Sequence, residues 1–323
     1  MKAVVCTELG EPSKLKVQDI DLGNVGDNQL LITVQAAGVN FPDALLVQGK
    51  YQVVIDPPFI PGNEIAGIVK EVGKNVNTEV GTKVIGLPDI GAFAEEIILD
   101  SNAVIPIDND FPSQVAAALP INYGTTYYAL KRRAHIKKGE KLLVLGAAGG
   151  IGTASIQLGK VLGAEVYAAV GSDEKEDYVN KIGADFVIRY DKDNLKEKIK
   201  ELTNGLGVDV VVDPVGGEYS EQAVRGTAWN GRYLVIGFAN GTIPSIPLNL
   251  TLVKGISIVG VWWGRWMKTS PDEAMQDFSE IISYIKKEEL TIEPAEIYTI
   301  EEVPKALQNF LDRNNLGKAV IEF

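Results

Sequence analysis

Glycines that follow a short apolar run are the residues of this chain best suited to chemistry, because together they can bind a pyrophosphate. Residues 141–145 read KLLVL, and residues 146–152 read GAAGGIG before an amphipathic segment begins. Glycine lets the backbone turn tightly and approach a ligand closely, and the free N–H groups of the following helix attract the anion. Because Ala147 occupies the first position of the G-x-G-x-x-G pattern, the surrounding elements must support the prediction of a dinucleotide site.

Alternating strand and helix patterns surround this loop. Strands are predicted at 141–145, 165–170, 185–189, 208–212, 232–237 and 256–262. Between the first two, apolar residues recur at helical spacing, and Gly163 stands where that helix should end. This alternation predicts a doubly wound parallel sheet, a usual fold around a pyrophosphate loop.

The end of the second predicted strand bears on which dinucleotide is bound. In NAD-binding proteins a carboxylate at this place holds the ribose 2′-hydroxyl. Here Gly171 and Ser172 follow the strand, Lys175 lies one helical turn further on, and Tyr190 ends the third strand. The Lys175 ammonium can reach a 2′-phosphate, so these residues predict NADPH as the cofactor.

Asp173 is the rival feature, because its carboxylate lies near the spacing expected for NAD. Asp173 and Glu176 are also spaced as a capping box for the following helix, which is the interpretation that we favour. The alternative for Lys175 is a solvated lysine on the helix surface with no contact to a cofactor. The missing strand-end acid favours the phosphate contact.

Composition limits the chemistry further. The 323 residues include one cysteine, Cys6, and one histidine, His135. This count excludes disulfides within the chain and zinc sites built from cysteine and histidine, so redox chemistry must come from a bound cofactor. We predict that Cys6 is a core residue and His135 a surface residue, with no catalytic role for either.

Length and charge indicate the class of protein. The chain is long enough for two domains, and 46% of its residues are hydrophobic. No apolar run approaches the roughly 18 residues of a membrane span, and no signal peptide is visible, so we expect a soluble cytoplasmic protein. The net charge of −12 opposes general attraction to nucleic acids and anionic membranes.

Four separated segments resemble the medium-chain dehydrogenase/reductase superfamily, and more narrowly its zinc-free NADPH:quinone oxidoreductase (zeta-crystallin-like) branch. They are 38–43 (GVNFPD), 61–67 (PGNEIAG), 123–130 (YGTTYYAL) and 146–152 (GAAGGIG). The resemblance implies a GroES-like β domain and a Rossmann domain with a doubly wound parallel sheet. The expected boundaries are 1–123 for the first, 124–264 for the second, and 265–323 for a return segment that packs on the first.

Three polar residues are candidates for the acceptor site. In zinc-containing relatives a cysteine and a histidine bind the metal at the positions that match Asn40 and Asn63. The resemblance implies that these amides face the substrate and can hydrogen-bond a carbonyl oxygen; turn stabilisation is the alternative. Tyr51 matches a tyrosine that related reductases place beside the hydride acceptor, where a phenol can donate a proton; packing is its alternative. We expect no metal.

The resemblance also implies the contacts of the cofactor. Thr125 would contact the nicotinamide, and Phe238 and Lys318 lie in loosely matching segments that close over the nicotinamide half. The pyrophosphate and the adenosine phosphate would be bound by Gly149, Gly150 and Ile151 and by Ser172, Lys175 and Tyr190, respectively.

A cluster of three tryptophans, at positions 262, 263 and 266, is a further candidate for the substrate site. Trp263 would then belong to an aromatic wall for a flat substrate, and Arg265 would bind an anionic one. A strand at a subunit interface would look the same, and Arg265 would alternatively stack on tryptophan.

We therefore expect an NADPH-dependent enzyme that transfers hydride to a quinone without a metal, with Asn40, Tyr51 and Asn63 stabilising charge on the acceptor oxygen. The first alternative is an enoyl-thioester or alkenal double-bond reductase, and the second is a non-enzymatic NADPH-binding protein. We also expect a homodimer, because the apolar strand at 256–261 would lie at a sheet edge that a second subunit protects.

Overall fold

The computed structural model describes all 323 residues, and the chain forms two compact units. Unit 1 comprises Met1–Ile121 and Ile292–Phe323, and unit 2 comprises Asn122–Thr291. The chain thus returns to unit 1 at Ile292, whereas the sequence predicted a return at residue 265.

The later return has a physical reason in helices α9 (Trp263–Thr269) and α10 (Pro271–Lys286), which pack within unit 2. The Arg132 guanidinium binds the buried Asp277 carboxylate of α10, with 2.7 Å between Nη2 and Oδ1. Because Asp277 would be costly to bury unpaired, this pair holds α10 in unit 2.

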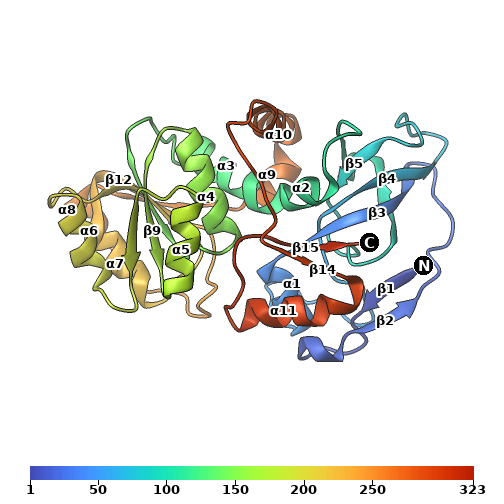
Figure 1. Cartoon of the computed structure of the whole chain (residues 1–323), viewed down its shortest axis with the longest axis horizontal. Helices are drawn as coiled ribbons and strands as arrows, with labels where there is room; N and C mark the ends of the chain where they lie inside the picture. The colour runs from blue at the N-terminus through green and yellow to red at the C-terminus, as the bar shows by residue number, and fades with distance from the viewer. The chain divides into compact units, whose positions relative to one another are not determined.

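Unit 2 is built on a six-stranded parallel sheet with helices on both faces (Figure 1). The order is β10-β9-β8-β11-β12-β13, which places the first strand centrally, as in the Rossmann fold. The strands are β8 (Lys141–Leu145), β9 (Glu165–Val170), β10 (Phe186–Arg189), β11 (Val208–Asp213), β12 (Thr227–Val235) and β13 (Ser257–Gly260). The predicted doubly wound parallel sheet is confirmed, although β12 begins earlier than the sequence indicated.

The helices of unit 2 bury apolar side chains against this sheet. Helices α4 (Gly150–Val161) and α5 (Asp173–Lys181) cover one face, and α6 (Leu195–Leu202) and α7 (Glu218–Gly226) cover the other (Figure 1). Leu143, Val211 and Ile199 are fully buried in one cluster between strands and helices. The remaining helical elements are α3 (Thr125–Tyr127), the π-helical η4 (Tyr128–Arg133) and α8 (Asn249–Lys254).

Unit 1 is the predicted GroES-like β domain. Its seven-stranded sheet has the order β14-β15-β3-β4-β5-β7, with β6 also paired to β3, and β1 and β2 form a separate pair. The strands are β1 (Lys2–Val5), β2 (Lys16–Asp19), β3 (Gln29–Val39), β4 (Ile65–Val72), β5 (Lys83–Gly86), β6 (Glu96–Asp100), β7 (Val104–Pro106), β14 (Glu296–Tyr298) and β15 (Ala319–Glu322). Ala319 pairs with Val39 in antiparallel register, which brings the neighbouring residues Lys318 and Asn40 together.

Short helices complete unit 1. They are η1 (Pro12–Lys14), α1 (Phe41–Val47), η2 (Ser101–Ala103), α2 (Ser113–Ala118), η5 (Ile300–Glu302) and α11 (Val303–Leu311), and the π-helical η3 (Pro120–Gly124) continues into unit 2. Cys6 is buried in the unit 1 core, and His135 is exposed, as predicted.

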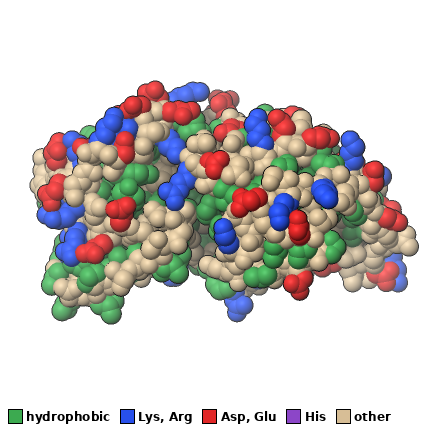
Figure 2. All heavy atoms as spheres, turned by 90° about the horizontal axis from the view of Figure 1, so that it is seen from below, with side chains coloured by type: hydrophobic (Ala, Val, Ile, Leu, Met, Phe, Trp, Pro, Cys, Tyr) green, Lys and Arg blue, Asp and Glu red, His purple; other side chains and the backbone are tan.

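Charged side chains of both signs lie on the surface (Figure 2). On the face shown in Figure 2, basic and acidic side chains are interspersed and no continuous basic patch forms. Every helix is too short or too polar to span a bilayer.

Candidate active site

The glycine loop of unit 2 leads from β8 into α4 and leaves the first amides of that helix free. Gly146 has a φ of +57°, a left-handed conformation that glycine adopts without strain. Gly149 precedes α4 and provides no side-chain cap, so the first N–H groups, beginning with those of Gly150 and Ile151, lack an acceptor within the helix. Such amides, at the positive end of the helix dipole, bind phosphate. The loop therefore fits the pyrophosphate of a dinucleotide.

Asn122, which the sequence did not single out, packs against this loop. Its side chain is buried, and a Cβ atom at position 150 would overlap with Asn122 Nδ2. Thr125, the predicted nicotinamide contact, begins α3 and is half-buried. Glycine at position 150 therefore leaves room for the buried amide group of Asn122.

The predicted adenosine-phosphate residues gather where β9 and β10 end. A Cβ atom at Gly171 would lie 2.9 Å from Tyr190 Cε2, so the Tyr190 ring passes directly over the residue before Ser172. Ser172 caps α5, because its Oγ accepts a hydrogen bond from Lys175 N at 3.3 Å. Lys175 is half-buried in the first turn of α5. The structure thus places these three residues at one edge of the sheet.

Asp173 does not cap α5, which corrects the interpretation from the sequence: Ser172 is the cap. The exposed Asp173 carboxylate binds the Arg189 guanidinium and lies 2.9 Å from Lys192 Nζ. Hydrogen bonds from Arg189 and Lys192 lower the pKa of Asp173 to about 2. Arg189 also binds Glu176 at 2.9 Å. The negative charge of Asp173 is therefore compensated at the edge where a 2′-phosphate is expected.

The loop after β12 carries Phe238, another predicted cofactor contact. A Cβ atom at Gly216 would lie 2.9 Å from Phe238 Cδ1. Gly216 is itself fixed, because the buried Asp213 carboxylate accepts hydrogen bonds from Val215 N at 2.7 Å and from Gly216 N at 2.8 Å. Asp213, which the sequence reasoning missed, therefore holds the loop on which Phe238 packs.

The tryptophans do not form one aromatic wall within unit 2. Trp263 is buried against Phe278, with ring centroids 6.1 Å apart, whereas Trp266 stacks on Tyr128 at 4.5 Å. Trp262 is exposed, as is Arg265. Trp263 and Trp266 lie three positions apart in α9, so they share one face of this helix, but one ring packs on Phe278 and the other on Tyr128.

In unit 1, the two predicted asparagines are hydrogen-bonded to each other. Asn40 Nδ2 donates to Asn63 Oδ1 at 3.3 Å and to Glu64 Oε1 at 2.6 Å. Asn40 is buried, whereas Asn63 is half-buried. The structure thus places these residues together, and it adds Glu64, which the sequence reasoning missed.

Lys318 completes this network. Its Nζ donates to Glu64 Oε1, to Asn40 Oδ1 at 2.6 Å and to Val39 O at 3.1 Å. These acceptors occupy the three N–H groups of the ammonium, and Lys318 is 3% exposed. In this conformation the Lys318 ammonium thus has no free N–H group for the predicted contact with the cofactor.

Two glycines make room for the network. A Cβ atom at Gly38 would overlap with the Glu64 carboxylate and lie 2.5 Å from Ala117 O. Gly62 has a φ of +92°, and a Cβ atom there would lie 2.5 Å from the Phe93 ring. The segment that carries Asn63 and Glu64 can therefore pass closely over its neighbours only with glycine at these positions.

Asp43 and Tyr51 are the titratable groups near this network. Asp43 is buried and accepts a hydrogen bond from Asn40 N at 2.7 Å. Burial raises the pKa of Asp43 to about 7, although the Asn40 N–H and the Lys318 charge lower it. Tyr51 is 36% exposed, and burial together with the Asp43 charge raises the pKa of its phenol. The Tyr51 hydroxyl is therefore a neutral donor at physiological pH.

Known proteins match both units. The alcohol dehydrogenase GroES-like domain matches residues 26–109, and the zinc-binding dehydrogenase domain matches residues 150–283. A quinone oxidoreductase-like protein 2 homolog of Nematostella vectensis is 40% identical over 327 residues, which cover 99% of this chain and 88% of that protein. The chain belongs to the quinone oxidoreductase branch of the medium-chain dehydrogenase/reductase superfamily. The resemblance found in four sequence segments is thereby confirmed.

This member of the superfamily is an oxidoreductase, and solved structures match it over the full length. The quinone oxidoreductase of Escherichia coli complexed with NADPH has a TM-score of 0.92 and 26% identity, with 100% of both chains covered. CurK enoyl reductase has a TM-score of 0.87 and 25% identity, with 99% of this chain and 98% of that chain covered. Because these relatives are different reductases, the acceptor must be inferred from the site residues.

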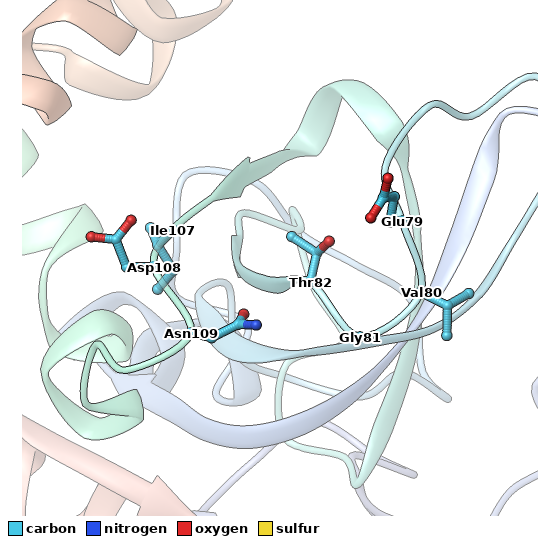
Figure 3. A pocket seen from close by; sticks show the side chains of 7 residues that line it. All are labelled: Glu79, Val80, Gly81, Thr82, Ile107, Asp108 and Asn109. Carbon is cyan, nitrogen blue, oxygen red and sulfur yellow. The ribbon is translucent and has the colours of Figure 1, made fainter.

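Two other features of this oxidoreductase concern ligands. No three His, Cys, Asp or Glu side chains lie close enough together to hold a metal ion. A depression of about 430 Å³ in unit 1 has Asp108 on one side and Glu79 on the opposite side (Figure 3). Its other lining residues are Val80, Gly81, Thr82, Ile107 and Asn109. None of them belongs to the network or the glycine loop, so this depression is not part of the candidate site.

Proposed function

We propose that this chain is an NADPH:quinone oxidoreductase that works without a metal. The observation that carries the proposal is the pair of carboxamides, Asn40 and Asn63, in place of metal-binding or acid–base side chains. An amide donor stabilises negative charge that develops on an oxygen without giving up its proton. This suits a quinone, because the reduced oxygens take their protons from solvent.

The cofactor is NADPH, which supplies a hydride when it is bound. The first amides of α4, with those of Gly149, Gly150 and Ile151, would hold its pyrophosphate. Ser172, Lys175 and Tyr190 bind the 2′-phosphate, where the ammonium compensates the charge and the tyrosine ring covers the adenosine. Thr125 and Phe238 hold the nicotinamide half.

The residues of unit 1 act on the acceptor. The Asn63 amide binds the acceptor oxygen and stabilises its negative charge. Tyr51 donates a second hydrogen bond, because its raised pKa keeps the phenol protonated. Solvent then protonates the product.

Tyr51 also favours a second candidate, an enoyl-thioester or alkenal double-bond reductase. A neutral, partly exposed phenol can protonate the carbanion that follows hydride transfer to a double bond. Tyr51→Phe separates the two functions. General acid catalysis contributes about 10² to 10⁴ in rate, so enoyl reduction should fall by that factor, whereas quinone reduction should change only a few-fold.

The first experiment follows NADPH oxidation by the purified protein with a small quinone and then with an enoyl-CoA, and NADH is the control. Turnover of the quinone with NADPH is the expected result. Turnover of the enoyl-CoA alone would replace the proposal with double-bond reduction. Tight NADPH binding without turnover of either acceptor would favour the non-enzymatic alternative.

We also propose a homodimer formed through β13. This strand is at the edge of the unit 2 sheet, and an unpaired edge exposes hydrogen-bonding groups that a second strand can cover. Apolar side chains nearby in sequence are exposed, including Ile258 in β13 and Trp262 two residues after its end. Light scattering at micromolar concentration should give twice the mass of 34.9 kDa, and a monomer would refute this assembly.

A further inference from the structure

The buried Lys318–Glu64 ion pair holds the Asn40 side chain in one orientation. The ammonium lies at Asn40 Oδ1 and the carboxylate lies at Asn40 Nδ2. Rotating this amide by 180° would place its NH2 group against Lys318 and its oxygen against Glu64, which would break two charge-assisted hydrogen bonds. The two charges therefore hold the Asn40 side-chain oxygen toward Lys318 and the Asn40 side-chain nitrogen toward Glu64.

The orientation of Asn40 in turn selects that of Asn63. Asn40 Nδ2 has two protons, of which one goes to Glu64 and the other to Asn63 Oδ1 at 3.3 Å. Asn63 thus turns its oxygen toward the buried network and keeps its own Nδ2 group clear of it. If the Asn63 amide were reversed, two NH2 groups would face each other.

We propose that Lys318 and Asn40 are positioning residues that hold the Asn63 Nδ2 group toward the acceptor oxygen. This inference rests on the proposed function, in which Asn63 binds that oxygen. Asn40 itself has both ends of its amide engaged in the buried network, so it has no donor to offer to a substrate. Of the two predicted asparagines, only Asn63 contacts the acceptor.

Steady-state kinetics of variants test whether Lys318 and Asn40 act on the reaction through Asn63. Asn63→Ala removes the donor and should lower kcat/KM for the quinone about 100-fold. Lys318→Met or Asn40→Ala should each lower it about tenfold, the loss expected for one hydrogen bond, and should have no further effect once Asn63 is alanine. The matched control is Lys83→Met, because Lys83 is also buried in unit 1 and donates to Phe111 O at 2.8 Å; its kcat/KM should stay unchanged.

Independent effects of Lys318→Met and Asn63→Ala, which multiply in the double variant, would overturn the proposal. So would an equal loss in Lys83→Met, because the loss would then follow from removing any buried lysine. If Lys318→Met does not fold, Asn40→Ala carries the test, since it leaves the ion pair in place.

Two further readouts do not depend on turnover. The Kd for NADPH, measured by fluorescence titration, should be unchanged in Lys318→Met. A Kd that is weaker by about tenfold would assign Lys318 to the cofactor instead.

The side-chain amide NMR cross-peaks of Asn63, assigned by their loss in Asn63→Ala, should shift in Asn40→Ala and in Lys318→Met. Unshifted cross-peaks would overturn the proposal. If the wild-type protein reduces no quinone, the proposed function fails, and the cross-peaks still decide whether Lys318 and Asn40 orient Asn63.

Discussion

The buried Asp43 carboxyl should make unit 1 less stable as the pH rises from 4 to 7. Its pKa is about 7 in the folded chain, against an ordinary value of 3.8 for an aspartate carboxyl. Between these values the folded state keeps a proton that the unfolded state has lost. Stability therefore falls as the pH increases through this window, and it is independent of Asp43 below and above it.

The size of the effect follows from the shift. The difference between about 7 and 3.8 is about 3 pKa units, and each unit corresponds to about 1.4 kcal/mol, so the full cost of ionising Asp43 is about 4 kcal/mol. About 2.5 kcal/mol of it should appear between pH 5 and pH 8. Asp43→Asn removes the titration, and its amide oxygen can still accept the hydrogen bond from Asn40 N.

Urea unfolding of wild-type protein and Asp43→Asn at pH 5, 6, 7 and 8 measures this difference. Circular dichroism is the appropriate probe, because all four tryptophans lie in unit 2 and their fluorescence would not report on unit 1. The variant should gain stability relative to wild type by about 2.5 kcal/mol over this range. The exposed Asp19 provides the control substitution, Asp19→Asn. A difference between Asp43→Asn and wild type that does not change with pH would show that Asp43 is ionised throughout, and the reasoning would fail.

Two substitutions in unit 2 test the cofactor site. Gly150→Ala would force a Cβ atom into Asn122 Nδ2 and should weaken NADPH binding about tenfold or more; adding Asn122→Ala should restore part of the affinity, and no restoration would disprove the steric explanation. Arg189→Leu would remove the guanidinium that pairs with the Asp173 and Glu176 carboxylates of α5 and should weaken NADPH relative to NADH by about 1 kcal/mol in paired titrations. An unchanged ratio of the two Kd values would contradict the assigned phosphate edge.

The periodicity of the sequence was sufficient for the sheet of unit 2 because its strands are buried apolar runs separated by helices. It was less informative for β12, which begins at Thr227 but includes the exposed residues Trp229 and Asn230. The return to unit 1 was also predicted too early. The apolar face of an amphipathic helix such as α10 predicts that the helix is buried on one side. The sequence does not indicate which of the two units it packs against.

The site was only partly predictable for a related reason. Local spacing identified the glycine loop, but the partners of Asp173 and of Asn40 come from other strands or from their ends. Arg189 reaches Asp173 from the next strand, and Lys318 is 254 positions from Glu64. The antiparallel pairing of β15 with β3 brings Lys318 to the network. The register of two strands so far apart in the chain cannot be predicted from a single sequence.

The cost of the Lys318–Glu64 pair is itself an argument for a positioning role. Burying two charges is expensive, and well-packed apolar residues in their place are often equally or more stable. A pair kept for stability alone would be a poor solution at 0% and 3% exposure. A pair with one charge at each end of an amide, however, does what apolar packing cannot, because it distinguishes the oxygen of Asn40 from its nitrogen. At positions where zinc-containing relatives have a metal to bind the substrate oxygen, this chain has an amide whose direction matters, and the two charges set that direction.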